Sequence, residues 1–562
     1  MASYTTEQIR NLALTGHRQG GKTSLAEALL HAGGAIPQPG SVERGTTVTD
    51  FLPLEKRYRH SLAPALCHLD CDGRHINLLD TPGYIDLLGR TLAVLPAVET
   101  VALVINANVG VDAYSQRIME WVRERGLDPL IIVNQIDGDA DLEALTREIQ
   151  ETFGRHCLPL NLPAAGRQRV LDCFFSLEGE PTEFSSVEEA HTRLVEQVIE
   201  VDEALMELYL EQEQSIRPEQ LHDPFEQALR EGHLIPICYT SATSGVGIRD
   251  LLAVITRLMP HPGEGNPPDF FLGEGPEAKL LHFSPDPQAH ALAHVFQVTI
   301  DPFVGKLSTF RVHQGTVRPD SQLYIGDGRK PFRPGHLLAL QGKQHIEMAR
   351  AIPGDICAVA KVEEIHTDAV LHDSHEEDHI HLRPVELPEP MYGLAVEATA
   401  RGDEQKLSDV LHRLADEDPS LRIEHDANLN ETVIRGLGEL HLRIVLEEME
   451  ERFGLKVKTH PPSIPYRETI TRPASAQYRH KKQTGGAGQF GEVHLRVEPL
   501  PRGAGFEFVD EVVGGAIPKQ FIPAVEKGVR QAMAEGLVAG FPVHDVRVTV
   551  YDGKHHPVDS KE

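Results

Sequence analysis

Eight residues near the start of the chain match the pattern G-x-x-x-x-G-K-[ST] of a phosphate-binding loop: Gly16-His17-Arg18-Gln19-Gly20-Gly21-Lys22-Thr23. A short apolar run, Asn11–Thr15, precedes the match, and apolar helical spacing follows it from Leu25, which is the context that the pattern requires. The glycines let backbone N–H groups and the helix N-terminus face an anion. Lys22 would reach the β- and γ-phosphates, and the Thr23 hydroxyl would bind Mg²⁺. The loop therefore predicts a nucleotide phosphate site.

Three further motifs follow in order, each after a candidate strand: Asp80-Thr81-Pro82-Gly83, Asn134-Gln135-Ile136-Asp137 and Thr240-Ser241-Ala242. Asp80 would lie near the metal, and the Gly83 N–H near the γ-phosphate. Asp137 could accept hydrogen bonds from guanine N1 and N2, which adenine cannot match, and Ser241 and Ala242 could offer backbone N–H groups to guanine O6. Open α/β sheets bind ligands at the carboxyl ends of their strands. Together the four motifs predict a GTPase rather than an unrelated phosphate-loop enzyme such as a kinase.

Length and composition limit the classes of protein that fit. The 562 residues suggest three or four domains, and a net charge of −30 argues against a protein that coats nucleic acid in general. No run of about 18 apolar residues could span a membrane, and the N-terminus lacks a signal-peptide pattern. The six scattered cysteines are typical of reduced thiols. We therefore expect a cytoplasmic protein.

Hydrophobic patterning predicts a multidomain α/β chain in which a P-loop GTPase domain is followed by an antiparallel β-barrel, a ferredoxin-like α+β domain and an α+β fourth domain. The candidate strands of the first domain are Asn11–Thr15, Ile76–Leu79, Val101–Ile105, Leu130–Val133 and Ile235–Tyr239. The expected boundaries are 1–262 for the GTP-binding domain, with an insert at about 157–232, then 277–385, 388–462 and 463–562. The Pro- and Gly-rich stretch Met259–Pro276 is expected to be a linker.

A histidine-rich stretch, residues 366–381, lies at the end of the predicted barrel domain. Its histidines are His366, His372, His375, His379 and His381. Such a tract can bind metal. No helix fixes a ligand spacing here, so the pattern favours a solvated connector over a metal site.

The last 100 residues differ from the rest in charge, with 13 Lys/Arg against 12 Asp/Glu. Gly486-x-Gly488-x-x-Gly491 matches the dinucleotide fingerprint, but a basic polar stretch precedes it and a strand-like stretch follows, whereas the fingerprint needs a strand before and a helix after. A glycine-rich turn beside Arg479, Lys481 and Lys482 suits contact with an RNA backbone. A solvated hairpin is the alternative interpretation.

Several longer motifs resemble those of the translational GTPases, specifically elongation factor G and its close paralogues, along the whole chain. They are Asp301-Pro302-Phe303-Val304-Gly305-Lys306-Leu307, Leu414-Ala415-Asp416-Glu417-Asp418-Pro419, Gly436-Leu437-Gly438-Glu439-Leu440-His441, Pro465-Tyr466-Arg467-Glu468-Thr469-Ile470 and Gly485-Gly486-Ala487-Gly488-Gln489-Phe490-Gly491.

The resemblance implies a monomeric GTPase that uses GTP/GDP and Mg²⁺ and couples hydrolysis to translocation or to ribosome recycling. The implied partners are ribosomal RNA, stalk proteins, transfer RNA and messenger RNA. The tips of the fourth domain that would reach toward RNA are Gly485–Gly491, which includes Gly486 and Gln489, and His555–Pro557, which includes His556. Because family members continue past Glu562, the resemblance also implies an incomplete fourth domain and an absent fifth domain.

Three positions depart from the family pattern. Tyr84 follows Gly83 where the family has a water-orienting His, so the catalytic pair would be Gly83 and Tyr84. The first switch falls on Arg59-His60-Ser61, where Ser61 keeps a hydroxyl for Mg²⁺ beside Thr23 and Asp80. Gln135 replaces the Lys that covers the guanine face. We therefore expect slow hydrolysis, and the alternative is a low-turnover, GTP-dependent ribosome binder with a regulatory or protective role.

Overall fold

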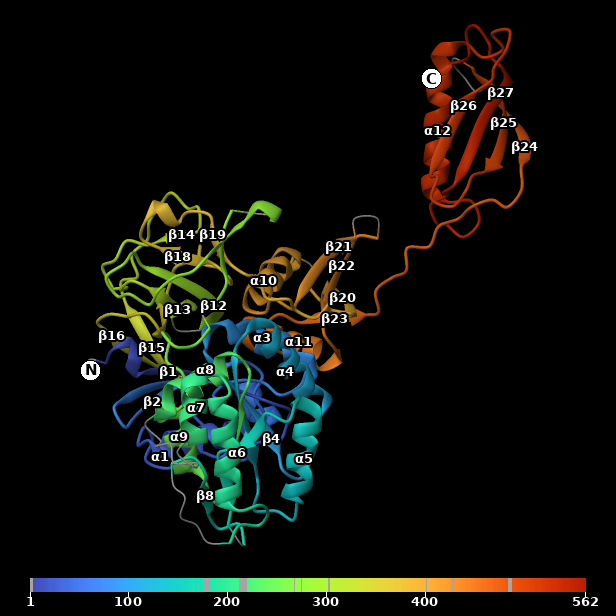
Figure 1. Cartoon of the computed structure of the whole chain (residues 1–562). Helices are drawn as coiled ribbons and strands as arrows, with labels where there is room; N and C mark the ends of the chain where they lie inside the picture. The colour runs from blue at the N-terminus through green and yellow to red at the C-terminus, as the bar shows by residue number, and fades with distance from the viewer. Residues whose placement is uncertain are drawn as a thin grey trace. The chain divides into compact units, whose positions relative to one another are not determined.

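The computed structural model describes residues 4–164, 166–175, 181–211, 220–266, 268–273, 275–301, 304–400, 402–426, 429–483 and 488–561. The chain forms two compact units, Met1–Pro461 and Pro462–Glu562 (Figure 1). Among the described helices, none combines the length and the apolar character that a membrane crossing requires.

The first domain is built on a seven-stranded sheet with the order β2-β3-β1-β4-β5-β9-β6. Its strands are β1 (Ile9–Thr15), β2 (Ala65–Cys71), β3 (Arg74–Asp80), β4 (Thr100–Asn106), β5 (Asp128–Asn134), β6 (Cys157–Pro159) and β9 (Ile235–Tyr239). Neighbouring strands are parallel except β2, which runs antiparallel to β3. All five strands predicted from apolar runs are present, and β2 and β6 are additional.

Helices cover both faces of this sheet and explain its continuous apolar runs. They are α1 (Lys22–Ala32), α3 (Leu88–Val94), α4 (Ala113–Arg125), α5 (Leu142–Phe153) and α9 (Ile248–Arg257). The short helix α2 (Pro53–Tyr58) packs instead in a separate cluster with Leu62 and Ile444. Along β4, Ala102 and Val104 join one buried cluster with α1 and α9, whereas Leu103 and Ile105 join another with α3, α4 and α5. A strand buried on both faces needs apolar side chains at every position.

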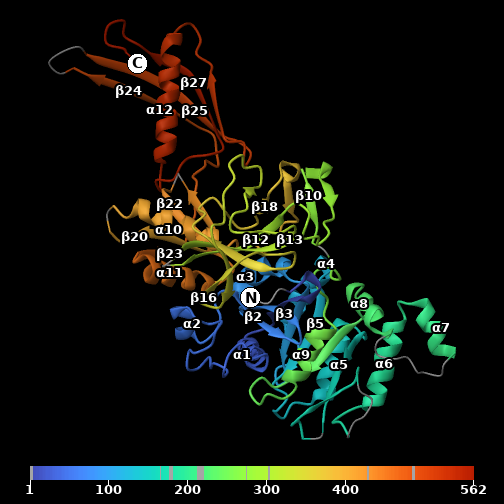
Figure 2. The same ribbon diagram turned by 90° about the vertical axis from the view of Figure 1, so that its left-hand side faces the viewer.

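An insert lies between β6 and β9. It contains β7 (Asn161–Pro163), β8 (Val170–Asp172), α6 (Val187–Ile199), α7 (Glu203–Glu211) and α8 (His222–Arg230). Figure 2 shows its three helices grouped at the side of the first domain. Leu194 and Val198 of α6 and Phe225 of α8 are fully buried in the same cluster as α1, so the insert is packed onto the sheet domain.

The second domain consists of antiparallel sheets. One has seven strands in the order β14-β18-β12-β13-β17-β15-β16 and the other has three in the order β11-β10-β19. The bounds are β10 (Phe270–Leu272), β11 (Lys279–Leu281), β12 (Leu292–Asp301), β13 (Gly305–Gln314), β14 (Tyr324–Ile325), β15 (Leu337–Gln341), β16 (Gln344–Met348), β17 (Ile356–Ala360), β18 (Val370–His372) and β19 (Ile380–Leu382). Strand β10 lies inside the predicted linker, because Phe270 is buried beside β19 rather than exposed.

The third domain is a split βαβ arrangement, as the sequence predicts. Its elements are β20 (Tyr392–Ala398), α10 (Glu404–Glu417), β21 (Arg422–Asp426), β22 (Glu431–Gly436), α11 (Glu439–Phe453) and β23 (Val457–His460), with strand order β21-β22-β20-β23. The predicted stripes on the two helices, including Leu411 and Leu442, are buried against each other and the sheet. Within the described residues, the short 3-10 helices are η1 (Thr6–Gln8), η2 (Ile85–Leu87), η3 (Leu95–Ala97), η5 (Gly275–Glu277), η6 (His375–Glu377) and η7 (Lys519–Phe521).

The second unit is an α+β domain. Its elements are β24 (Ala474–Lys482), β25 (Gln489–Pro499), β26 (Phe506–Asp510), α12 (Ile522–Glu535) and β27 (Val546–Lys554). The strand order is β24-β25-β27-β26, and only β26 and β27 pair in parallel. Val529 and Met533 of α12 pack on Val546 and Val548, which defines the small core of this unit.

Candidate functional site

The predicted phosphate-binding loop connects β1 to α1, and its backbone conformation depends on glycine. Gly21 has φ +84° and immediately precedes α1, so the first N–H groups of the helix face the loop. Lys22 is buried, and its Nζ donates to the carbonyls of Gly16 (2.7 Å) and His17 (3.0 Å). Burial lowers the pKa of Lys22 to about 8. An anionic phosphate in the loop would offset the free-energy cost of burying the charged Lys22 side chain.

Gly83 lies directly against this loop. A Cβ atom at Gly83 would be 2.4 Å from Lys22 Nζ and 2.7 Å from the carbonyl carbon of His17, so only glycine fits. The structure therefore brings the strand end after Asp80 and the phosphate-binding loop together, as the order of the motifs predicts.

Oxygen side chains from four segments converge beside the loop. Thr23 Oγ1 donates to Asp80 Oδ2 (2.7 Å) and lies 3.2 Å from Ser61 Oγ. Thr49 Oγ1 also donates to Asp80 Oδ2 (2.8 Å), and Asp50 is 3% exposed beside them. Burial raises the pKa of Asp80, and burial followed by the charge of Asp80 raises that of Asp50 to about 7.

This oxygen cluster fits Mg²⁺. Hard divalent cations prefer carboxylate and hydroxyl oxygens. Asp80 Oδ1 is buried and has no hydrogen-bond partner within the described part of the chain. Two buried carboxylates close together are costly unless a cation neutralises them. Thr23, Ser61 and Asp80 belong to the predicted metal set, whereas Thr49 and Asp50 were missed, because no short motif marks them.

The predicted base-recognition residues lie at the ends of β5 and β9. Asn134 links three segments, because its Nδ2 donates to Gly20 O (3.0 Å) and its Oδ1 accepts from the Ala242 N–H (3.0 Å). The Ser241 N–H donates to Val246 O (2.9 Å), so both backbone groups predicted for guanine O6 have partners within the protein. Asp137 is exposed at the same end of the sheet, where its carboxylate is available to a base.

Gln135 and Gln19 form the other side of this region. Both have positive φ, 63° in each case. Gln135 Nε2 donates to Gln19 O (3.2 Å), and Asn106 Nδ2 donates to Gln135 Oε1 (3.0 Å) and to Gln19 O (2.9 Å). The amide of Gln135 is therefore held against the phosphate-binding loop.

Tyr84 packs among side chains rather than standing alone. Its ring centroid is 4.3 Å from that of His60, and the Arg18 guanidinium lies 5.5 Å above the ring. The ring also joins a cluster that contains Leu62 and, from α11, Ile444. Burial lowers the pKa of His60, which favours the neutral imidazole. Tyr84 thus connects the loop, the segment before β2 and the third domain.

A buried ion-pair network links the same region to the third domain. Arg90 Nε donates to Asp418 Oδ2 (2.6 Å), Arg90 Nη1 donates to Leu62 O (3.0 Å), and His441 Nε2 lies 2.9 Å from Asp418 Oδ2. Burial alone would raise the pKa of Asp418, but the Arg90 charge and the His441 hydrogen bond hold it well below its usual range. The Leu440 N–H, at the start of α11, donates to Asp86 Oδ2 (2.9 Å). Asp418 and His441 belong to two of the motifs that resemble the family, but their contact with Arg90 could not be predicted, because the three residues are far apart in the chain.

The described RNA-binding candidates of the fourth domain lie on β24 (Arg479, Lys481 and Lys482), at the start of β25 (Gln489) and after β27 (His556). Every residue of β24 is exposed, which includes Lys481 and Lys482. Arg479 forms an ion pair with Glu492 on β25. Gln489 Oε1 lies 3.1 Å from His480 Nε2, and the His556 ring is 6.4 Å from that of Phe490, next to Gln489. Gly486 lies outside the described residues.

The histidine-rich stretch does not assemble metal ligands. His372 is buried between the carbonyls of Ser374 and Gly326, both at 2.7 Å. His375 and His379 instead pair with Asp378 and Asp327. In the described segments, no group of three or more His, Cys, Asp or Glu side chains could hold a metal ion. All six cysteines are free thiols.

Four family models match successive parts of the chain. They are the elongation factor Tu GTP binding domain (residues 7–261), elongation factor G domain 2 (290–373), elongation factor G domain III (387–461) and elongation factor G domain IV (462–562).

Whole-chain relatives agree with these matches. An elongation factor G-like protein of Mycobacterium tuberculosis is 40% identical over 99% of this chain and 81% of its own length. An elongation factor G-like protein of Thermotoga maritima is 33% identical, with 99% of this chain and 82% of the relative covered. A crystal structure of a protein from Thermus thermophilus has a TM-score of 0.83 at 33% identity and covers 99% of this chain and 82% of that one.

Proposed function

Because this chain belongs to the elongation factor G family of translational GTPases, we propose that it binds GTP/GDP with Mg²⁺ and couples GTP hydrolysis to translocation or to ribosome recycling. The observation that carries the nucleotide part is the convergence of Thr23, Ser61 and Asp80 beside a glycine-dependent phosphate-binding loop.

The residues divide the chemistry as follows. Lys22 and the loop N–H groups bind the β- and γ-phosphates. Thr23, Ser61 and Asp80 hold Mg²⁺, which neutralises charge on the phosphate oxygens. Gly83 lies against Lys22, and its N–H would donate to the γ-phosphate. Asp137 would accept hydrogen bonds from the guanine N1 and N2 groups.

Tyr84 is the candidate for the residue that positions the attacking water. A tyrosine hydroxyl can donate to and accept from the attacking water but has no basic nitrogen. Its ring is anchored by His60, Arg18 and the apolar cluster, which limits how far the hydroxyl can move. We therefore propose slow turnover.

The second candidate function is a low-turnover, GTP-dependent ribosome binder with a regulatory or protective role. The packing of Tyr84 favours this second function. The affinity for GTP depends on the loop and the metal-binding oxygens, whereas the rate of hydrolysis depends on the geometry around the attacking water. Both candidates place the protein in the cytoplasm as a monomer whose partners are ribosomal RNA, stalk proteins, transfer RNA and messenger RNA. Lys481, Lys482, Gln489 and His556 are the proposed RNA contacts among the described residues.

The nucleotide site is tested by replacing one hydroxyl at the start of α1. Thr23→Ala should lower the Mg²⁺-dependent affinity for a fluorescent GTP analogue, since a metal ligand is lost. Ser24→Ala removes an exposed hydroxyl one residue away and is the matched control. Equal loss in both variants, or none in Thr23→Ala, would contradict the assignment.

A further inference from the structure

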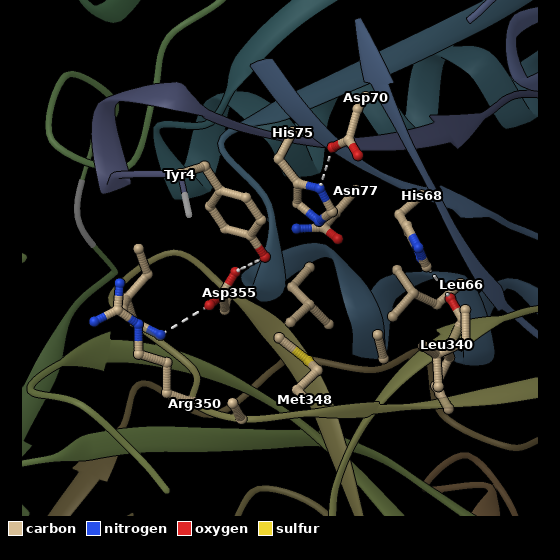
Figure 3. A pocket seen from close by; sticks show the side chains of 15 residues that line it. Tyr4, Leu66, His68, Asp70, His75, Asn77, Leu340, Met348, Arg350 and Asp355 are labelled. Atoms are coloured by element: carbon tan, nitrogen blue, oxygen red, sulfur yellow. Dashed lines mark hydrogen bonds and ion pairs between the residues drawn. The ribbon is translucent and has the colours of Figure 1, made fainter. Parts of the chain in front are cut away.

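A cavity of about 350 Å³ lies in the first unit, between the β2–β3 hairpin, the N-terminal segment and the β15–β16 hairpin of the second domain (Figure 3). Its volume falls at the lower end of the range of small-molecule pockets, roughly 300–1,000 Å³. No residue of the phosphate-binding loop and none of the metal oxygens lines it. It is therefore distinct from the nucleotide site.

The two sides of the cavity differ in chemistry. One side is apolar and is lined by buried side chains of Leu66, Leu340, Met348 and Ile352. The opposite side is made of flat rings, as Figure 3 shows. Tyr4 stacks on His75 with ring centroids 4.3 Å apart and planes 9° apart, and the His68 ring is 5.5 Å from His75. Flat rings facing an apolar surface suit a planar ligand.

Among the polar side chains that line this space are those of His68, His75, Asp70, Asn77, Asp355 and Arg350, and the two imidazoles can offer acceptor atoms that the described residues leave unused. His68 Nδ1 lies 3.2 Å from the Leu340 carbonyl, and His75 Nδ1 lies 2.8 Å from Asp70 Oδ1. A carbonyl or carboxylate can only accept, so each Nδ1 carries the hydrogen. In a neutral ring, Nε2 then presents a lone pair. Burial lowers the pKa of His68, which favours that neutral form.

Neither Nε2 is used by the protein within its described residues. The Asp70 carboxylate, with a side chain 70% exposed, adds further acceptor capacity at the rim. The Tyr4 hydroxyl is committed, because it donates to Asp355 Oδ1 (2.9 Å). The cavity therefore offers imidazole and carboxylate acceptors beside an apolar surface.

We propose that this cavity is a second ligand site, for a planar nitrogen heterocycle that carries N–H donors, such as an amino-substituted fused ring. The ring would lie between the histidines and the Met348 side, and its donors would meet the Nε2 atoms of His68 and His75.

A metal ion is the competing occupant, since metal-binding histidines also donate their second N–H to a carbonyl or carboxylate. Two features favour the heterocycle. No third ligand completes a metal set among the described residues. The cavity is also much larger than one ion needs, and apolar side chains form one of its sides.

Calorimetry with the full chain tests the proposal, using 2-aminobenzimidazole and its analogue 2-methylbenzimidazole, which lacks the exocyclic amino donors. Saturating GDP and Mg²⁺ keep both probes out of the guanine site. The amino probe should bind about tenfold more tightly, the usual effect of one buried hydrogen bond. Equal affinities, or no binding of either probe, would overturn the proposal.

Two variants locate the binding. His68→Phe keeps a ring and removes the lone pair, and it should weaken the amino probe about tenfold. Ile346→Trp, at a half-exposed lining position, should abolish binding by filling space, and it tests the site even if His68→Phe fails to fold. His336→Phe is the control, because His336 pairs with Glu347 on the domain surface outside the cavity. Unchanged affinity in Ile346→Trp would overturn the proposal. The proposal would also be overturned if Zn²⁺ displaced the amino probe and His68→Phe abolished Zn²⁺ binding. That result would assign the cavity to a metal ion.

Discussion

The charged side chains of Lys22 and Asp80 in the nucleotide site are buried, whereas those of the basic strand β24 in the fourth domain are exposed. Lys22, Thr23 and Asp80 are buried, and each contacts a residue from another motif or loop position. Lys481 and Lys482 lie on a strand in which every residue is exposed. Binding at the nucleotide site depends on side chains whose positions are fixed by packing. Binding at β24 would depend on the charge of solvent-exposed side chains. Substitutions should therefore have large, position-specific effects in the first and small, salt-dependent effects in the second.

The largest effect is expected at Lys22. Lys22→Ala should weaken binding of a non-hydrolysable GTP analogue by about a hundredfold or more, because the β/γ charge loses a desolvated cation. Calorimetry measures this directly, and Lys56→Ala, an exposed lysine of the same domain, is the control. An affinity in Lys22→Ala equal to that of the parent would show that the loop is not the phosphate site.

Tyr84 should affect rate rather than affinity. Tyr84→His should accelerate hydrolysis by up to about a hundredfold if the imidazole can be seated, since positioning of the water acts only in the transition state. Single-turnover phosphate release gives the rate, and Tyr58→Phe, in the same apolar cluster, controls for loss of a hydroxyl. A Tyr84→Phe variant as fast as the parent would show that the hydroxyl contributes nothing.

Asp137 should decide which base is bound. Asp137→Asn should reduce the preference for GTP over ATP by about tenfold or more, because the acceptor for the guanine donor pair is lost. Competition against a fluorescent GDP analogue measures it, and Asp139→Asn, exposed two residues later, should have no effect. Equal binding of ATP and GTP by the parent protein would contradict the guanine assignment.

The smallest effect is expected on β24. The double replacement of Lys481 and Lys482 by Ala should lower ribosome affinity only about threefold. The slope of log affinity against log salt concentration should fall by the amount expected for about two lost phosphate contacts. Arg479→Ala should change the salt dependence less, because Glu492 already pairs with Arg479. Co-sedimentation with ribosomes at several salt concentrations is the measurement, and Lys519→Ala with Lys527→Ala is the control. A double variant with unchanged salt dependence would remove β24 from the RNA interface.

Much of the fold could be predicted because local patterns agree with it. The apolar runs of the first sheet, and stripes such as Leu411 and Leu442, mark buried strands and helices directly. Strand β2 was missed because it is an edge strand of one short hairpin, in which His68 and Asp70 interrupt the apolar residues. Its partner is set by the turn at Asp72-Gly73, both with positive φ, rather than by an apolar run.

The grouping of the candidate site residues could be predicted in part. Lys22, Asp80 and Asn134 belong to motifs whose spacing carries the chemistry, and the structure brings them together. Thr49 and Asp50 come from a segment without a pattern, so only the folded chain places them beside Asp80. The pairing of Arg479 with Glu492 likewise depends on strand register, which charge composition does not encode.

Ribosome-stimulated GTP hydrolysis by the full chain tests the central claim most directly. Phosphate release is measured at saturating GTP with and without ribosomes, and Lys22→Ala serves as the blank. We predict that ribosomes raise the rate of the parent protein, and that Tyr84→His raises it further. A rate that ribosomes leave unchanged in both the parent protein and Tyr84→His would contradict the coupling of hydrolysis to the ribosome.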